Sequence, residues 1–113
     1  MGTKIVVRGG EISVSAIENR PNEYTTGGSL TSLSVYCGEV KEFKLGTPDA
    51  VWTVATGCAH RKITAVNVKW LEDAGATIKK NALTGAPNHC LVSGISIEEF
   101  VKIFKKNALI FEK

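Results

Sequence analysis

The sequence lacks the features that assign a chain quickly to a large functional class. No apolar run approaches the roughly 18 to 20 residues that span a bilayer, which argues against a membrane partner. There is no Walker loop, no dinucleotide-binding glycine fingerprint and no G-x-S-x-G elbow. The stretch MGTKIVVRGGEISV has neither the apolar length nor the cleavage site of a signal peptide. We therefore expect one soluble domain over residues 1–113, without a cofactor.

Cysteine is scarce and odd in number. Cys37, Cys58 and Cys90 are the three in the chain, and none lies in a C-x-x-C arrangement. At least one of them has no partner within the monomer, and a scattered, odd set is more typical of a reducing compartment than of a disulfide framework. Free cysteine behaves as a small apolar residue and is commonly buried. We therefore expect a cytoplasmic protein with buried thiols.

Charge is modest and uneven. The formal net charge is +3, with −1 over residues 1–60 and +4 over residues 61–113. One basic face is compatible with these numbers, but the dense Lys/Arg stripe of a dedicated nucleic-acid binder is missing. Composition therefore argues against nucleic acid as the partner.

The first half of the chain has the alternating pattern of β-strands. Gly9-Gly10 suits a two-residue hairpin turn because both positions tolerate positive φ. The apolar run 50–56 has little polar face, so we expect it to form a central strand. The predicted strands are KIVVR (4–8), EISVSAI (11–17), LTSLSVYC (30–37), VKEFKL (40–45), AVWTVAT (50–56) and HCLVSG (89–94).

The stretch HRKITAVNVKWLEDAGATI fits two alternatives. As a helix over 61–74, it places Ile63, Val66 and Trp70 near one face and ends before Gly75, a typical residue after a helix. As a strand, it has the expected density of β-branched residues. The ending W-L-E-D-A-G before the short apolar A-T-I indicates a joint between a helix and a strand, and we adopt the helix.

The C-terminal region predicts a helix over 96–106. Ser96 and Glu99 have the spacing of a capping box, in which each side chain bonds to the backbone amide of the other residue. An apolar stripe at helical spacing follows, made of Ile97, Phe100, Val101 and Phe104. The apolar run 109–111 suits an edge strand or a partner contact. Together the elements predict an α+β fold: a mainly antiparallel sheet of about six strands, with a C-terminal helix and one central helix packed on one face.

The segment P-N-H-C places His89 beside Cys90 at the start of a predicted strand. Pro87 fixes its own φ and favours an extended residue before it, so the chain enters the strand aligned. Neighbouring strand residues point to opposite faces, which argues against a Cys-His dyad formed by these two residues. If Cys90 faces the core, His89 lies at the surface or in a cleft.

Metal binding is a weak alternative. Cys58, His60, His89 and one further cysteine could supply four zinc ligands, but their spacing matches no common zinc motif. Two neighbouring ligands on one strand cannot easily reach a single ion. We therefore expect no metal, and we expect each of these side chains to be structural or exposed.

The loops 57–62 and 84–89 are the best candidates for a binding site. The residues we select for ligand binding are His60, Arg61, Asn88, His89 and, from the polar loop 18–28, Tyr24. An enzyme interpretation would use His60 and His89 as base and acid with Lys62 nearby, in a metal-independent nuclease-like reaction. It requires the two rings to meet, which spacing alone does not establish.

Three segments together resemble a family of small uncharacterised bacterial proteins. They are LTSLSVY (30–36), VWTVATG leading to WLEDAGATI (51–78), and GAPNHCLVSG (85–94). An L-S-V run, a stretch ending near a glycine and a P-x-H strand follow each other in that family. The resemblance covers residues 30–94 and implies no known activity, but it supports the helix over 61–74 and draws attention to His89.

Three functions remain in view. The first is a small, non-catalytic binding domain for a protein or a small ligand. The second is the nuclease-like enzyme. The third is a homo-oligomer joined through an edge strand at Leu109-Ile110-Phe111.

Overall fold

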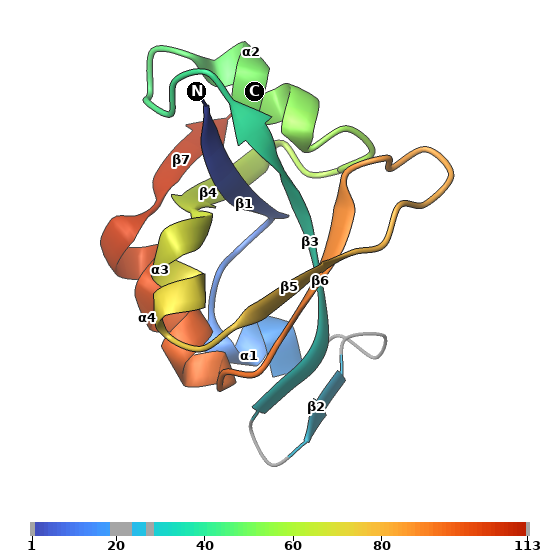
Figure 1. The fold of residues 1–113 in the computed structure, drawn as a ribbon, viewed down its shortest axis with the longest axis vertical. Helices are drawn as coiled ribbons and strands as arrows, with labels where there is room; N and C mark the ends of the chain where they lie inside the picture. Colours follow the sequence, from blue (N-terminus) through green and yellow to red (C-terminus); the bar gives the residue numbers. More distant parts are fainter. Residues whose placement is uncertain (1, 19–23, 27–28, 113) are drawn as a thin grey trace.

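The computed structural model describes residues 2–18, 24–26 and 29–112, and it shows an α+β fold within these ranges (Figure 1). The elements follow one another as β1 (Thr3–Gly9), α1 (Val14–Glu18), β2 (Tyr24–Thr26), β3 (Ser29–Val40), α2 (Pro48–Val54), β4 (Lys62–Asn67), α3 (Val68–Asp73), β5 (Thr77–Lys80), β6 (His89–Ser93), α4 (Ile97–Asn107) and β7 (Leu109–Glu112).

The strands form an antiparallel sheet in the order β5-β6-β3-β1-β4-β7, and β2 pairs with β3 off this path. Strand β1 is central because Ile5, Val6 and Val7 are apolar on both faces and none is exposed. Its neighbours come from distant parts of the sequence. The predicted antiparallel sheet and C-terminal helix are confirmed.

Alternation along the strands divides the core between the two faces of the sheet. Val6 and its neighbours on one face pack against Ile17 of α1, Leu71 of α3 and the apolar stripe of α4. Ile5 and Val7 belong to the other face, which packs against α2. Figure 1 shows α3 and α4 side by side, with α2 at the end of the molecule far from α1.

The C-terminal helix forms as the capping box predicts. The Glu99 backbone N–H donates to Ser96 Oγ at 3.0 Å, and this bond starts α4. Phe100 and Phe104 stack with ring centroids 4.5 Å apart in the buried stripe. Strand β7 then lies at the edge of the sheet, with Ile110 52% exposed. Self-association through this edge stays a prediction.

The predicted strand over 11–17 and its hairpin at Gly9-Gly10 are wrong. Helix α1 begins there instead, because Ser13 acts as its cap: Ser13 Oγ accepts from the Ala16 N–H at 3.1 Å. Gly10, at φ 79°, turns the chain away from β1, and its N–H donates to the Lys62 carbonyl. The apolar–polar alternation over residues 11–17, which predicted a strand, therefore belongs to a short capped helix.

Two further predicted strands, 40–45 and 50–56, are also wrong. Strand β3 already includes Val40, and the chain turns beyond it, where Thr47 Oγ1 donates to the Lys44 carbonyl. Residues 50–54 lie in α2, which carries Pro48 and Asp49 in its first turn. Proline is preorganised for that position and lacks the N–H that would stay unpaired, so Pro48 starts a helix.

The stretch HRKITAVNVKWLEDAGATI, which fitted both a helix and a strand, forms a strand followed by a helix. Residues 62–67 are strand β4, and residues 68–73 are helix α3, so the helix prediction for 61–74 is wrong for its first half. Asn67 makes the division, because its side-chain oxygen accepts from the Lys69 N–H at 3.0 Å and caps α3. Gly75, at φ 99°, follows the helix as predicted.

The expectation of unpaired cysteines is wrong for two of the three. Cys37 on β3 and Cys90 on β6 form a disulfide with their Cα atoms 5.9 Å apart, a normal separation, and Cys58 is a free thiol. The pair is separated by 53 residues and meets only because β3 and β6 are neighbours. Spacing could not show this pairing. In the described ranges, no helix is long and apolar enough to cross a membrane.

Candidate functional site

A pocket of about 550 Å³ lies where α3, β5 and the start of β6 meet the ends of β1 and β3. We call it the disulfide pocket, because both Cys37 and Cys90 line it. Its volume lies within the roughly 300 to 1,000 Å³ range of small-molecule sites. Its lining residues are Lys4, Ile5, Cys37, Gly38, Glu39, Val68, Glu72, Ile78, Lys80, Ala82, Pro87, Asn88, His89 and Cys90.

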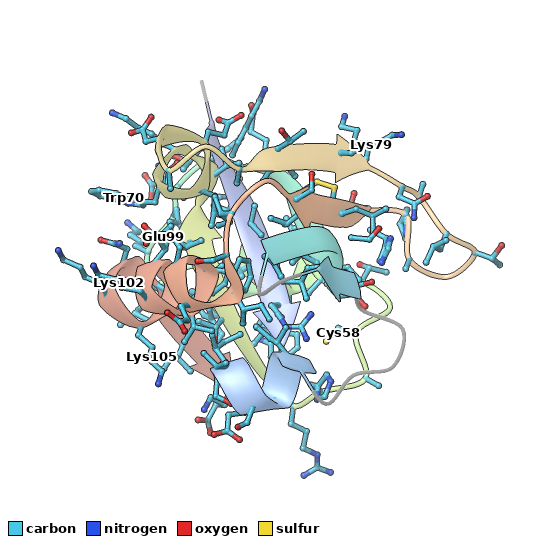
Figure 2. The ribbon with its side chains drawn as sticks, turned by 90° about the horizontal axis from the view of Figure 1, so that it is seen from below. Cys58, Trp70, Lys79, Glu99, Lys102 and Lys105 are labelled. Atoms are coloured by element: carbon cyan, nitrogen blue, oxygen red, sulfur yellow. A yellow bond between two sulfur atoms is a disulfide. The ribbon has the colours of Figure 1, made fainter. Side chains whose placement is uncertain are left out.

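The disulfide joins β3 to β6 diagonally. Cys90 is directly opposite Val35, while the Cys37 N–H donates to the Asn88 carbonyl at 2.9 Å. Figure 2 shows the sulfur–sulfur bond beside β5, the strand that carries Lys79 and Lys80. Cys90 is 1% exposed and Cys37 is half-buried, so Cys37 is the more accessible half of the bond.

Four charged side chains of both signs line the same pocket. Lys80 is directly opposite Cys90 in the β5–β6 ladder, and Lys4 is directly opposite Glu39 in the β1–β3 ladder. Glu72 comes from α3. The apolar residues Val68 and Ile78, which pack against the same core cluster as Cys90, line the pocket together with these charges. The arrangement can therefore hold a small molecule that carries both a positive and a negative group.

His89 is positioned by the strand and by one backbone group. Its Nδ1 lies 3.0 Å from the Asn81 carbonyl oxygen. A carbonyl only accepts, so Nδ1 carries the proton and a neutral ring presents its lone pair at Nε2. The ring packs edge-on against Tyr36, with centroids 6.3 Å apart, and it is only 8% exposed. His89 and Cys90 point to opposite faces of the sheet, as predicted. Cys90 belongs to the core that packs against α1, α3 and α4, whereas His89 is directly opposite Tyr36, which packs on the α2 face.

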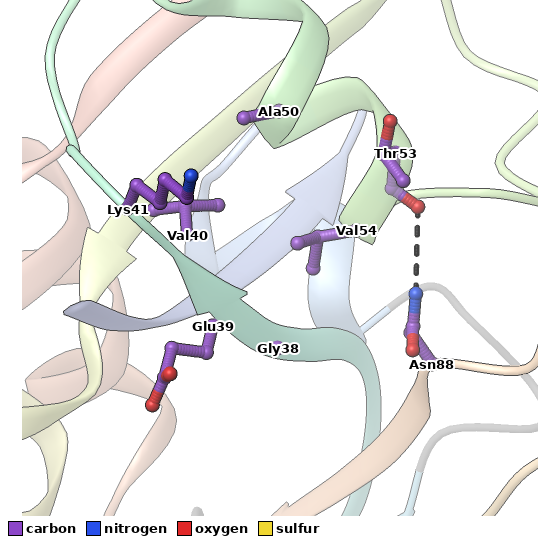
Figure 3. A pocket seen from close by; sticks show the side chains of 8 residues that line it. All are labelled: Gly38, Glu39, Val40, Lys41, Ala50, Thr53, Val54 and Asn88. Carbon is purple, nitrogen blue, oxygen red and sulfur yellow. Dashed lines mark hydrogen bonds between the residues drawn. The ribbon is translucent and has the colours of Figure 1, made fainter. Parts of the chain in front are cut away.

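A smaller pocket, of about 310 Å³, lies between α2 and the end of β3 (Figure 3). It is lined by Gly38, Glu39, Val40, Lys41, Ala50, Thr53, Val54 and Asn88. Asn88 closes one side, because its Nδ2 donates to the Thr53 carbonyl at 3.4 Å. Asn88 and Glu39 line both pockets, which therefore adjoin across the end of β3.

Cys58 and His60 occupy a different site, over the end of β1. A Cβ at Gly9 would overlap Cys58 Sγ and lie 2.7 Å from His60 Cδ2, so both side chains pack onto the glycine. Burial raises the pKa of Tyr36 above its usual 10.0, and the charge of a Cys58 thiolate raises it further. Tyr36 therefore lies between this site and His89.

The loops 57–62 and 84–89 pack directly against each other at Gly57 and Gly85. A Cβ at Gly57 would overlap the Gly85 carbonyl oxygen. Of the two loops, only 84–89 contributes to the two pockets, so the expected cleft between them is not where these pockets lie.

The predicted site residues accordingly separate. Asn88 and His89 line the disulfide pocket, while His60, Arg61 and Lys62 line neither pocket and are exposed. The Tyr24 side chain lies outside the part of the chain that the structure describes.

Metal coordination and the two-histidine reaction both require His60 and His89 to act together, but the two side chains contact different residues. His60 lies against Gly9, whereas His89 lies against Tyr36 and Asn81. In the described ranges, no group of three or more His, Cys, Asp or Glu side chains is placed to hold a metal ion.

No protein-family model, curated protein or solved structure matches the chain. Its function therefore has to be argued from the residues of the pocket.

Sequence reasoning missed most of that pocket. Lys4, Glu39, Glu72 and Lys80 look like ordinary solvated charges in the sequence, and only strand pairing brings them together. One signal was present. Cys37 shares a strand face with the apolar Leu33 and Val35, and Cys90 shares one with Val92, so both cysteines point inward.

Proposed function

We propose that the protein is a small binding domain whose disulfide pocket holds a zwitterionic small molecule, such as an amino acid or a short peptide. The observation that carries the proposal is the placement of Lys80 and Glu72 around apolar side chains in one pocket of suitable volume. Ammonium groups recognise carboxylates and carboxylates recognise ammonium groups, while the apolar lining contacts the carbon skeleton between them.

The proposal places the protein in the cytoplasm, where a small peptide ligand is available. The free thiol of Cys58, at a separate site from the Cys37–Cys90 disulfide, supports that compartment. Cytosolic disulfides are usually catalytic or redox-sensing rather than structural.

Titration with S-methylglutathione, a zwitterionic peptide without a thiol, tests the proposal by NMR. We expect the amide signals of Ile78, Lys80 and Glu39 to shift with a saturable dependence on peptide concentration. Glu72→Gln should weaken the apparent affinity about fivefold, on the scale of one solvent-exposed charge contact. Asp73→Asn is the matched control, because Asp73 is the next residue of the same helix and lines neither pocket.

Shifts that cluster around His60, or no shifts at millimolar peptide, would contradict the assignment of this pocket. Equal weakening by Glu72→Gln and Asp73→Asn would contradict the role of Glu72.

A further inference from the structure

We propose that Cys37–Cys90 is a thiol–disulfide exchange site, attacked by a small thiol that enters the disulfide pocket. The inference rests on the proposed function only for access, because the thiol has to reach the same pocket. It adds an activity to binding: the pocket would transfer electrons between a small thiol and the protein.

Access is unequal at the two ends of the bond. Both cysteines line the pocket, but Cys90 is 1% exposed and belongs to the helix-covered core, while Cys37 is half-buried. A thiolate attacks a disulfide sulfur along the axis of the sulfur–sulfur bond, so it reaches the sulfur that is accessible on the side opposite its partner. The geometry therefore makes Cys37 Sγ the attacked atom and Cys90 Sγ the leaving group.

The leaving group has a cation beside it. Lys80 is directly opposite Cys90, and residues that face each other across antiparallel strands have Cβ atoms about 4.5 to 5.5 Å apart. The lysine stem can place its ammonium near the disulfide, where it attracts the incoming thiolate and stabilises negative charge on the departing sulfur. Lys4 contributes less, because Glu39 lies directly opposite it.

The reaction balances with a thiol as the only co-reactant. The thiolate attacks Cys37 Sγ, a new sulfur–sulfur bond forms, and the old electron pair leaves on Cys90 Sγ, which takes a proton from solvent. A second thiolate then attacks the sulfur of the bound thiol. It releases the oxidised small-molecule disulfide and leaves two protein thiols. The protein gains two electrons and two protons, and two small thiols are oxidised.

Cys58 serves as an internal reference. It lines neither pocket and packs over Gly9, so it has no part in the exchange. Cys58→Ser therefore leaves a chain in which every adduct reports on the Cys37–Cys90 bond.

The test uses the full chain with Cys58→Ser, oxidised and then mixed with glutathione. The reaction is quenched with acid and alkylated, and peptides are mapped by mass spectrometry. We expect a transient glutathione adduct on the peptide that contains Cys37, followed by two alkylated thiols. Lys80→Gln should slow adduct formation about fivefold, on the scale of one nearby charge in water.

Lys79→Gln is the matched control. Lys79 is the preceding residue of β5, opposite Leu91 and therefore on the other face, and it lines neither pocket (Figure 2). It should leave the rate unchanged. Circular dichroism of each variant confirms that the fold is retained.

Several outcomes would overturn the exchange site. They are adducts found first on Cys90, equal slowing by the two lysine variants, exchange no faster than in the urea-unfolded oxidised chain, and alkylation of all cysteines before any thiol is added. If S-methylglutathione binds but glutathione forms no adduct, exchange fails and the proposed binding function stands. If the adduct forms at Cys37 without S-methylglutathione binding, the exchange site stands and the zwitterion assignment fails.

Discussion

The molecule contains two cysteine–histidine neighbourhoods, and their difference lies in the backbone around them. His89–Cys90 and Cys58-Ala59-His60 use the same residue types at similar spacing. The first lines a pocket of about 550 Å³ and carries a disulfide, whereas the second fills the space over Gly9. Residue type therefore does not decide which neighbourhood can bind a ligand. Strand pairing does, because β5, β6 and β3 surround the first with charges from distant parts of the chain.

The largest expected difference between the two neighbourhoods is in stability. Replacing both Cys37 and Cys90 with alanine should lower the free energy of unfolding by about 4 kcal/mol, the chain-entropy value for a cross-link over 53 residues. Cys58→Ser should cost less than about 1 kcal/mol, as expected for a partly exposed free thiol. Urea unfolding of the oxidised proteins measures both. Similar losses for the two changes would show that the disulfide contributes little.

A second substitution probes the packing of the Cys58–His60 neighbourhood. Gly9→Ala should destabilise the protein by about 1 to 2 kcal/mol, because the new methyl group overlaps Cys58 Sγ and crowds His60. Adding Cys58→Gly should recover part of this loss, and the double-mutant cycle gives the coupling.

Gly46→Ala is the control for that cycle, because the nearest atom to its new methyl, Lys44 Cε, is 3.9 Å away. It should change stability by less than about 0.5 kcal/mol. If Gly9→Ala were equally neutral, the close packing of Cys58 and His60 over β1 would be wrong.

The smallest expected effect is at Tyr36, which lies between the two neighbourhoods. Its pKa is raised in the folded protein, first by burial and then by Cys58, so the folded state favours the protonated phenol. The corresponding stability is fully present below the unfolded pKa of 10.0 and is lost as pH rises through the folded pKa. Tyr36→Phe should therefore weaken the fall in stability above pH 10.0.

Phenolate absorbance in a Tyr24→Phe background measures this shift directly. Cys58→Ser should lower the pKa of Tyr36 but leave it above the usual value, because burial is the larger cause. A pKa that returned fully to normal in Cys58→Ser would reverse the order of the two causes.

The sequence predicted the elements whose signals are local. The Ser96–Glu99 spacing specified the start of α4, and the alternation in LTSLSVYC specified β3, because neither signal needs information from elsewhere in the chain. Helix α2 was missed because Val51 and Val54 read equally well as an apolar strand, and only Pro48 in the first turn marks the helix.

The candidate site was predictable only in part. Asn88 and His89 were identified because a proline turn and a histidine stand out locally, and both line the pocket. Lys80 and Glu72 were not, since their significance depends on which strands pair and on where α3 packs. The Cys37–Cys90 bond depends on the same non-local pairing.

The long-range pairing of strands in this sheet also determines when the disulfide can form. Gly9 pairs with Ile63, and Tyr36 pairs with His89. Each of these strand pairings must first overcome the entropy cost of closing a loop of about 50 residues, before its contacts stabilise it. Such topologies fold in milliseconds to seconds rather than microseconds. An added oxidant, such as a small-molecule disulfide, can join Cys37 to Cys90 only after this late pairing of β3 with β6. The appearance of the bond during refolding should therefore serve as a kinetic marker of sheet assembly.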